Sequence, residues 1–387
     1  MGCPILRNSL GLLVFLPSLI CISVPAPGAE NVDVQEMKSE PKEKKSRLGG
    51  YKILPIPIII TEPAIGEGLG VAITVFHPVK GGSVPRATTP TSIGQMDNER
   101  SAPPVATAVF GAYTNSDTRA AGVAHTNNWR EDHIRYTGAL AATIINSEFY
   151  VLDQPIKYTL DGRLIYQDLN FRLADSDYFL GFSFSYLDTE NTFGSDSLAA
   201  KPPPTFHKDS KNVGLAVRGS YDSRDNTMNP YRGQLVDLSL WRYDDAIGSD
   251  HDYWSTKLKA LSFHHFHDKF TLGLRLDVSA VDGQPPFYGY PWVKLRGIPA
   301  MRYQDERAGA IEMEGRYQLA QKWEVLGFAG LGFTDGNKRI FENPSDIYNV
   351  GMGTRYELFA EQNVWVGVDV ARGPEEWNWY IQVGHSW

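Results

Sequence analysis

Aliphatic residues alternate with charged or small residues, with a period of two, through the C-terminal half of this chain. Around Leu274, for example, the leucines of one face stand opposite Arg275 and Asp277 on the other. The same alternation occurs in residues 349–358, 363–371 and 379–387. Because successive side chains of a strand point to opposite faces, the pattern predicts β-strands with one aliphatic and one polar face. The predicted fold class is therefore all-β.

Alternation alone does not decide which face is buried, since a soluble antiparallel sheet turns its apolar face to a core. Three features favour an apolar belt that faces outward: a secretory leader, the absence of cysteine after that leader, and Trp387 at the end of an alternating strand. Outer-membrane barrels combine such alternation with aromatic girdles at both membrane interfaces. We therefore expect a transmembrane antiparallel β-barrel, with Trp377, Trp379 and Trp387 as interfacial anchors.

The N-terminal residues predict two short segments before the barrel. Residues 1–29 carry one cation and a central apolar run, which is the arrangement of a secretory signal peptide. Both cysteines, Cys3 and Cys21, lie within it, so the mature chain offers neither a disulfide framework nor a cysteine metal site. Residues 30–50 are rich in both charges and poor in apolar side chains, which predicts a disordered linker. Residues 51–387 are then expected to form one barrel domain.

The charge of the chain excludes two further classes of protein. The formal net charge is −8, and nucleic-acid binding needs clustered Lys and Arg to neutralise phosphates, so no nucleic-acid partner is expected. After the leader, no stretch of about 18 residues is free of charge, which excludes a helical membrane span.

Turn signals divide the remaining sequence into about 16 strands, the even number that a bacterial single-chain barrel needs. The predicted strands are 52–61, 68–78, 104–114, 119–128, 134–149, 155–173, 178–190, 212–222, 233–246, 252–267, 269–282, 307–319, 323–334, 347–359, 363–372 and 377–387. In an antiparallel barrel, successive connections alternate between the two ends. By this count the long connections 191–211, 283–306 and 335–346 lie at the same end, which we call the outer end. The connection 79–103 departs from this rule, because it is long and Pro-rich yet falls at the inner end.

Two motifs in fixed order carry a resemblance to a known family. The first is the segment DSRDN with a later proline and glycine, and its residues are Asp222, Arg224, Asp225, Pro230 and Gly233. The second is the segment LRGI, followed by EGRY, and its residues are Arg296, Gly297 and Glu314. Together they resemble the bacterial surface antigen domain of the BamA/TamA family of outer-membrane proteins. The resemblance covers roughly the last 170 residues, and the N-terminal half matches mainly in its strand pattern.

This resemblance implies a barrel whose sixth outer loop folds back into the lumen, with its arginine against acidic residues of the inner wall. Arg296 matches that arginine, because the strand count places it between the eleventh and twelfth strands. Its candidate partner is Glu314, with Glu312 on the same face, and a charge-assisted pair is implied. The sequence departs from the family in two ways. Gly330 stands where an acid is expected in the next strand, and only the short linker precedes the barrel, which leaves no room for POTRA domains that receive client proteins.

The first predicted strand contains Pro55 and Pro57, and Pro63 follows just after it; all three are at odd positions. Alternate residues of a strand direct their backbone groups toward the same neighbour, so the missing N–H donors face one side. Because the hairpin with the second strand needs its ladder, we expect the gaps to face the sixteenth strand, which ends at Trp387, and to weaken the seam that closes the barrel. The predicted seam residues are therefore Pro55, Pro57 and Trp387. The alternative is that Pro55 and Pro57 merely end the pairing outside the membrane zone.

The remaining candidate sites are interpreted as structural. His264, His265 and His267 fall at a short inner turn and lack the spaced partners of a catalytic metal site. Asp222 and Asp225 are expected to shape their turn through hydrogen bonds. No catalytic motif occurs, so neither enzyme activity nor a cofactor is expected. A solvated lumen network without individual roles is expected from Arg218, Lys257, Lys259, Arg275, Asp277, Arg316, Arg355, Glu357 and Asp369.

Our first functional hypothesis is a non-enzymatic barrel in the outer membrane of a Gram-negative bacterium, acting in protein or lipid insertion or translocation. Its expected partners are outer-membrane lipid, client outer-membrane proteins and a separate periplasmic protein. The second hypothesis is a passive pore or structural surface protein without client handling. A third, a periplasmic or outer-membrane enzyme, finds no supporting residues in the sequence.

Overall fold

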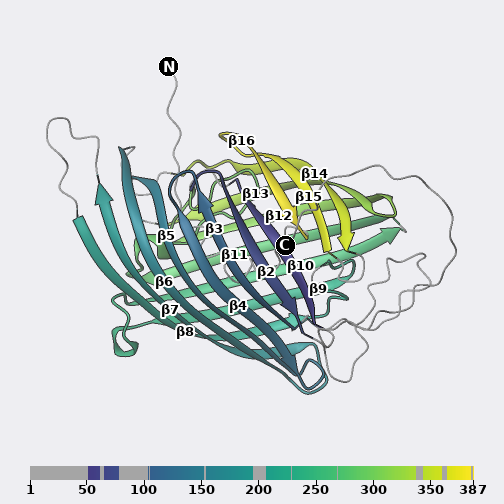
Figure 1. The fold of residues 1–387 in the computed structure, drawn as a ribbon, viewed down its shortest axis with the longest axis horizontal. Coiled ribbons are helices and arrows are strands. Elements are labelled where there is room, and N and C mark those ends of the chain that lie inside the picture. Colours follow the sequence, from purple (N-terminus) through teal and green to yellow (C-terminus); the bar gives the residue numbers. More distant parts are fainter. Residues whose placement is uncertain are drawn as a thin grey trace.

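The structure is a computed structural model that describes residues 51–61, 65–77, 103, 105–151, 154–194, 206–227, 229–267, 269–336, 343–359, 364–384 and 387. The predicted signal peptide, the charged linker, Pro63 and most of the 79–103 connection lie outside these residues. The described residues form one antiparallel sheet of 16 strands, in which each strand pairs with its neighbours in the chain. Figure 1 shows this sheet wound into a barrel.

In chain order the strands are β1 (Lys52–Ile60), β2 (Gly68–Phe76), β3 (Ala106–Thr114), β4 (Arg119–Trp129), β5 (Ile134–Val151), β6 (Gln154–Arg172), β7 (Tyr178–Gly194), β8 (Phe206–Asp222), β9 (Gly233–Tyr243), β10 (Tyr253–His267), β11 (Phe270–Gly283), β12 (Arg307–Ala320), β13 (Trp323–Asp335), β14 (Ile347–Phe359), β15 (Val364–Arg372) and β16 (Trp377–Val383). Two 3-10 turns, η3 (Asp245–Ile247) and η4 (Phe287–Gly289), lie in connections at the outer end. Within the described ranges, no helix has the length and apolar character that a membrane crossing requires.

The predicted all-β fold with 16 antiparallel strands is confirmed, and the largest differences lie at two strand ends. β7 and β8 extend to Gly194 and Phe206, into residues predicted as loop. Thr189 and Asn191 are buried in this hairpin, so the polarity of the segment reflects an inward face and not a loop. β16 ends early because Gly384 adopts a left-handed backbone with φ of 73°, which turns the chain away from the strand direction.

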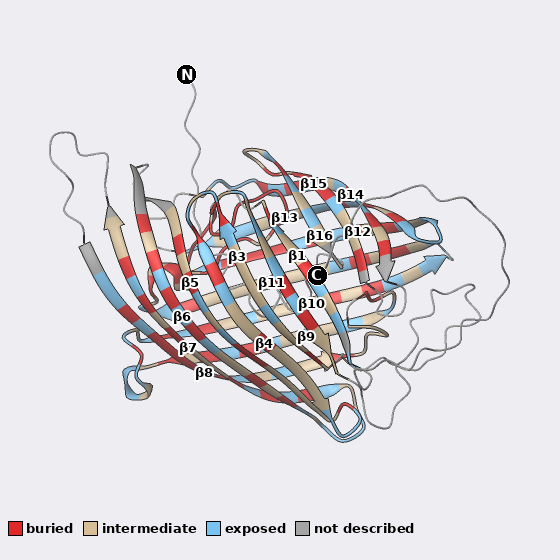
Figure 2. Cartoon of the chain, in the orientation of Figure 1, coloured by how far each residue is buried: buried red, intermediate tan, exposed pale blue. Residues whose placement is uncertain are grey.

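Aliphatic side chains cover the outside of the barrel. Met352 is 71% exposed and Leu69 is 67% exposed, whereas the side chain of Asp369 is fully buried. Figure 2 shows exposed and buried residues alternating along most strands. Soluble sandwiches bury their aliphatic faces, so this inverted arrangement gives the sheet an apolar outer belt and a charged interior.

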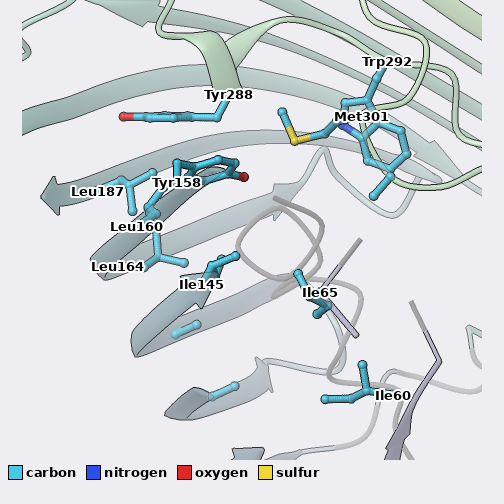
Figure 3. Packing of buried hydrophobic residues seen from close by; sticks show 13 residues of the cluster. Ile60, Ile65, Ile145, Tyr158, Leu160, Leu164, Leu187, Tyr288, Trp292 and Met301 are labelled. Atoms are coloured by element: carbon cyan, nitrogen blue, oxygen red, sulfur yellow. The ribbon is translucent and has the colours of Figure 1, made fainter. Parts of the chain in front are cut away.

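The interior is filled by residues 284–306 of the β11–β12 connection, which we call the lumen loop. Its Tyr288, Trp292 and Met301 belong to a buried apolar cluster with side chains of β1, β5, β6 and β7. Figure 3 shows these three residues facing strand residues that include Tyr158, Leu160 and Leu187. On the other wall, a second apolar cluster joins the loop to β12 and β14, and its members include Val293, Leu295 and Ile347. The lumen loop therefore contacts both sides of the barrel.

Candidate functional site: the latch of the lumen loop and the seam

Arg296 extends from the lumen loop to the acidic inner face of β12. Its Nη1 donates to Glu314 Oε2 at 2.7 Å, and its Nε donates to Glu312 Oε1 at 3.2 Å. The two glutamates share the inward face because they are one residue apart on a strand, and each is 1% exposed. The structure thus brings together the three residues that the resemblance had implied.

A third acid, Asp369 on β15, also contacts this arginine. Arg296 Nη1 lies 3.2 Å from Asp369 Oδ2. The sequence predicts Asp369 only as part of a general lumen network, and Gly330 stands where an acid is expected in the strand after Glu314. The alternation of β15 shows that Asp369 points inward, but only the register of four neighbouring strands brings it to Arg296. We call Arg296, Glu312, Glu314 and Asp369 the latch cluster.

Other side chains enclose the latch cluster. The guanidinium carbon of Arg296 lies 3.4 Å from the ring centre of Phe328, a cation–π contact. Asn349 Nδ2 donates to Glu312 Oε1 at 2.7 Å, and Arg355 donates to both carboxylate oxygens of Asp369 at 2.5 and 2.9 Å. Arg355 is fully buried, so the expectation of a solvated network is wrong at this point of the lumen. Burial lowers the pKa of Arg296, but Glu314, Glu312 and Asp369 outweigh it and raise that pKa.

Gly297 allows the lumen loop to lie against the outer turn between β15 and β16 (residues 373–376). Its φ is 84°, and a Cβ at this position would lie 2.9 Å from the backbone nitrogen of Gly373. Its N–H donates to Tyr380 Oη at 3.0 Å, and its carbonyl accepts from Asn378 Nδ2 at 3.1 Å. Arg302 adds an ion pair with Glu375, with Nε to Oε2 at 3.0 Å. Polar contacts therefore fix the loop to the last hairpin of the barrel.

The DSRDN motif builds the inner turn between β8 and β9 (residues 223–232). Arg224 Nε donates to Asp222 Oδ1 at 2.9 Å. Asp225 Oδ1 accepts from the backbone nitrogens of Asn226 and Tyr231 at 2.9 and 3.1 Å. Gly233 has φ of 95°, and a Cβ there would lie 2.3 Å from a backbone oxygen. Together these contacts shape the turn.

Arg316 links this inner turn to the latch cluster, a connection that sequence analysis missed. Its Nη2 donates to the Pro230 carbonyl at 3.0 Å, and its Nε lies 3.6 Å from Glu314 Oε1. Arg316 is 2% exposed. The EGRY segment could have given the signal, because Arg316 follows Glu314 on the same inward face. The two motifs of the resemblance thus meet in one buried ionic network.

The ends of the sheet meet without a ladder. β1 pairs with β2 in continuous register from Lys52 to Ile60, but among the described residues no register pairs β1 with β16. The Thr61 hydroxyl donates to the carbonyl of Trp379 at 3.0 Å across this seam. Pro55 and Pro57 do not interrupt the β1–β2 register, which supports the prediction that their missing donors face the seam.

The predicted anchor role of Trp387 at the membrane interface is wrong. Its indole lies inside the barrel, where Nε1 donates to Glu312 Oε2 at 2.7 Å and the ring packs on Phe263. The turn at Gly384 redirects the chain into the lumen, so the odd–even pattern of β16 no longer applies to Trp387. Trp377 and Trp379 are exposed on the outside, as an interfacial position requires.

The histidines at the end of β10 are held by hydroxyl groups. His265 Nδ1 pairs with Thr271 Oγ1 and His264 Nε2 with Ser262 Oγ, both at 2.9 Å. Across the described ranges, no group of three or more His, Cys, Asp or Glu side chains is arranged to hold a metal ion.

Comparison with known proteins shows the fold. No protein-family model matches the sequence, and no curated protein matches it. BamA from Haemophilus ducreyi lacking POTRA domains 1–3 is similar in structure, with a TM-score of 0.55 and 11% identity over 86% of this chain and 70% of that chain. CdiB from Acinetobacter baumannii has a TM-score of 0.53 and 10% identity over 86% of this chain and 59% of its own. CdiB from Escherichia coli has a TM-score of 0.55 and 10% identity over 85% of this chain and 62% of its own. The chain thus has the fold of these barrels and spans about three-fifths of the CdiB chains.

Proposed function

We propose that this protein is an outer-membrane barrel of a Gram-negative bacterium that acts in the insertion or translocation of proteins or lipids by opening its β1–β16 seam. The observation that carries the proposal is the seam itself. Every other neighbouring pair of strands is joined by a ladder, with a local bulge in three of them. Among the described residues no register joins β1 to β16, and the seam is crossed by the hydrogen bond from Thr61, the residue after β1, to the Trp379 carbonyl. The barrel therefore has one junction that can separate at low cost.

The outer belt supports the location in a membrane. Large aliphatic side chains such as Leu69, Leu331 and Met352 are exposed on the outer face, and water would make such a surface costly. A bilayer removes this cost, and the similarity of the fold to BamA and CdiB supports the outer membrane in particular.

The lumen loop fills the barrel, which supports a function that depends on a conformational change and not on an open, wide pore. The latch cluster fixes the loop to β12 and β15, and the ion pair of Arg302 with Glu375 fixes it to the hairpin that ends in β16. The loop can therefore hold the C-terminal side of the seam in place while β1 moves. No catalytic residue is assigned, and the proposed partners are outer-membrane lipid, client outer-membrane proteins and a separate periplasmic protein.

A disulfide across the seam tests this function. The chain has no cysteine after Cys21, so the double variant Thr61→Cys with Trp379→Cys adds the only pair of thiols to the segment after the leader. The cross-linked barrel should lower the levels of other outer-membrane proteins or surface lipids in the cell, and reduction should restore them. The control is Ile73→Cys with Val109→Cys, two residues directly opposite each other in the β2–β3 ladder.

Depletion of the protein separates this function from the alternative of a passive pore or structural surface protein. Lower levels of other outer-membrane components after depletion support insertion or translocation. Unchanged levels, together with steady ion conductance of the purified barrel in planar bilayers, would reject it in favour of the passive role.

A further inference from the structure

A cavity lies inside the barrel beneath the η4 end of the lumen loop, away from the latch cluster. Its volume is about 170 Å³, measured as space for the centres of water-sized molecules. Strands from β6 to β11 supply its wall, and Tyr288 to Lys294 of the lumen loop supply the opposite side. Since one water needs roughly 10–15 Å³ by this measure, the cavity has room for a ligand about the size of one phosphorylated sugar ring.

Two lysines give the cavity a positive charge. Lys257 of β10 and Lys294 of the lumen loop both line it, and no Asp or Glu is found among its described lining residues. Neither ammonium group makes an ion pair within the described part of the chain. Each instead lies near a tryptophan ring, with Lys257 Nζ 5.8 Å from the centre of Trp241 and Lys294 Nζ 5.4 Å from that of Trp292.

This arrangement leaves two ammonium groups at the cavity, Lys257 exposed to the lumen and Lys294 half-buried, with no ion pair to a described carboxylate; Asp277 acts on Lys294 only from beyond ion-pair distance. Burial lowers the pKa of Lys294, Asp277 raises it and Arg275 lowers it, and the net result is a lowered pKa. An anion in the cavity would pair with both ammonium groups, because hydrogen bonds between charged partners are shorter and stronger than those between neutral groups.

Aromatic rings form one wall of the cavity. Tyr243 and Tyr253 stack in parallel with ring centres 4.3 Å apart, and Trp241 stacks beside Tyr243 at 6.0 Å. Tyr253 covers one face of Tyr243 and Gly214 lies against the other, so Tyr243 turns its ring edge and hydroxyl group to the cavity. Ring edges carry partial positive charge, which favours contact with the oxygen atoms of a polar ligand such as a sugar.

Hydroxyl groups between the rings distinguish a sugar from a purely aromatic ligand. Ser185, Ser255 and Ser279 line the cavity, and within the described residues their side chains make no hydrogen bond. An aromatic acid would leave these groups without partners, whereas the hydroxyl groups of a sugar can pair with them.

We propose that this cavity binds a soluble sugar phosphate, with the phosphate between Lys257 and Lys294 and the ring against Trp241 and Tyr243. Ladders join each neighbouring pair of strands from β6 to β11 and are unbroken beside the cavity, so the head group of a lipid whose acyl chains lie outside the barrel has no passage through this wall. The ligand therefore reaches the cavity through the lumen.

Calorimetric titration of the purified full-length barrel with glucose 6-phosphate tests the proposal. The detergent must lack a sugar head group, because such a detergent would compete. Glucose 6-phosphate should bind at least about tenfold more tightly than either glucose or inorganic phosphate, since each of these offers only half of the contacts. Equal affinity for inorganic phosphate would overturn the assignment of a sugar ring, and absence of binding would overturn the site.

Matched lysine variants localise the site. Lys257→Gln and Lys294→Gln should each weaken binding of glucose 6-phosphate by about tenfold. Lys259→Gln is the control, because Lys259 lies two residues from Lys257 on β10 but does not line the cavity. An equal loss in Lys259→Gln would contradict the site. Heat-dependent gel mobility of each variant verifies that the barrel is folded.

A ring variant and a lipid competitor complete the test. Trp241→Leu should weaken binding of glucose 6-phosphate and leave the weak binding of inorganic phosphate unchanged; equal losses for both would overturn the contact between the sugar and Trp241. Micellar lipopolysaccharide should not displace glucose 6-phosphate. Displacement would overturn the soluble source and indicate a lipid head group.

Discussion

The two walls of the barrel differ in the contacts that hold the lumen loop. Both walls contact the loop through an apolar cluster. Within the described residues, the wall of β12 to β16 adds buried ion pairs and hydrogen bonds around Arg296, whereas the wall of β1 to β7 holds the loop mainly by the apolar cluster around Trp292 and Met301. Ion pairs and hydrogen bonds depend on direction, whereas apolar contacts depend mainly on buried area. The comparison indicates that the loop stays with the C-terminal wall when the walls separate, because the apolar contacts can slide or part without leaving a buried charge.

The largest effect is expected from Arg296→Ala. The variant leaves three buried carboxylates without this cation, and the removal of one partner from a buried ionic cluster costs about 3–5 kcal/mol. The lumen loop should become sensitive to proteinase K, and the barrel should lose its heat-resistant gel mobility at a lower temperature. Arg307→Ala is the matched control, because its ion pair with Asp335 is more than half exposed and solvent screening leaves it little effect on stability. If Arg296→Ala and the native barrel resisted protease equally, the ion pairs of Arg296 would not be what holds the loop to the C-terminal wall.

A smaller effect is expected on the apolar wall from Leu160→Ala. Leu160 is fully buried in the cluster that faces the loop, so its truncation should cost about 2–4 kcal/mol of barrel stability. Protease should still spare the loop around Arg296, because the latch cluster is intact. Leu160→Met, which nearly conserves volume, should cost less than about 1.5 kcal/mol. Cleavage near Arg296 in Leu160→Ala would show that the two walls hold the loop as one unit.

Trp387→Phe tests whether the C-terminal residue belongs to the ionic wall. The change keeps an aromatic ring on Phe263 but removes the N–H that donates to Glu312, a bond to a charged group that should contribute about 1.5 kcal/mol. The urea midpoint of the purified barrel should fall accordingly. Trp377→Phe changes an exposed tryptophan at the start of β16 and should leave the midpoint within experimental error.

The smallest effect concerns the inner turn. Burial raises the pKa of Asp225, while backbone N–H groups of Arg232, Tyr231 and Asn226 lower it, and the net pKa is above its usual value of 3.8. The folded state therefore holds this proton more strongly than the unfolded state, and the resulting stability is lost as pH rises through the folded pKa. Asp225→Asn keeps an oxygen acceptor without the charge, so it should gain about 1 kcal/mol or less over the native barrel between pH 3.5 and pH 7. The urea midpoints of the variant and the native barrel are measured at both pH values. If the difference between the two proteins were the same at pH 3.5 and at pH 7, the raised pKa of Asp225 would be contradicted.

The strands could be predicted from the sequence because alternation is a local property of the chain, visible in segments such as residues 270–279. The pairing of Arg296 with Glu312 and Glu314 could be inferred from the resemblance, because the motifs preserve the spacing between loop and strand. Asp369 could not be assigned to the latch cluster, since its approach depends on the register of β12 to β15. The position of Trp387 depends on the left-handed Gly384, a conformation that the odd–even pattern does not contain. The cavity could not be predicted, because it depends on the path of the lumen loop and the loop has no periodic sequence pattern.

The order of the strands in the sheet follows the order of the chain without exception. Each hairpin can consequently be added to the one before it, and every ladder requires only the next segment of polypeptide to arrive. The lumen loop is different, because its contacts reach strands at both extremes of the sequence. We therefore expect the loop to enter the lumen before the first and last strands come together. We therefore expect fastening of the first strand to the last to be the final event of biogenesis, and a chain with a displaced loop to stall as an open, curled sheet.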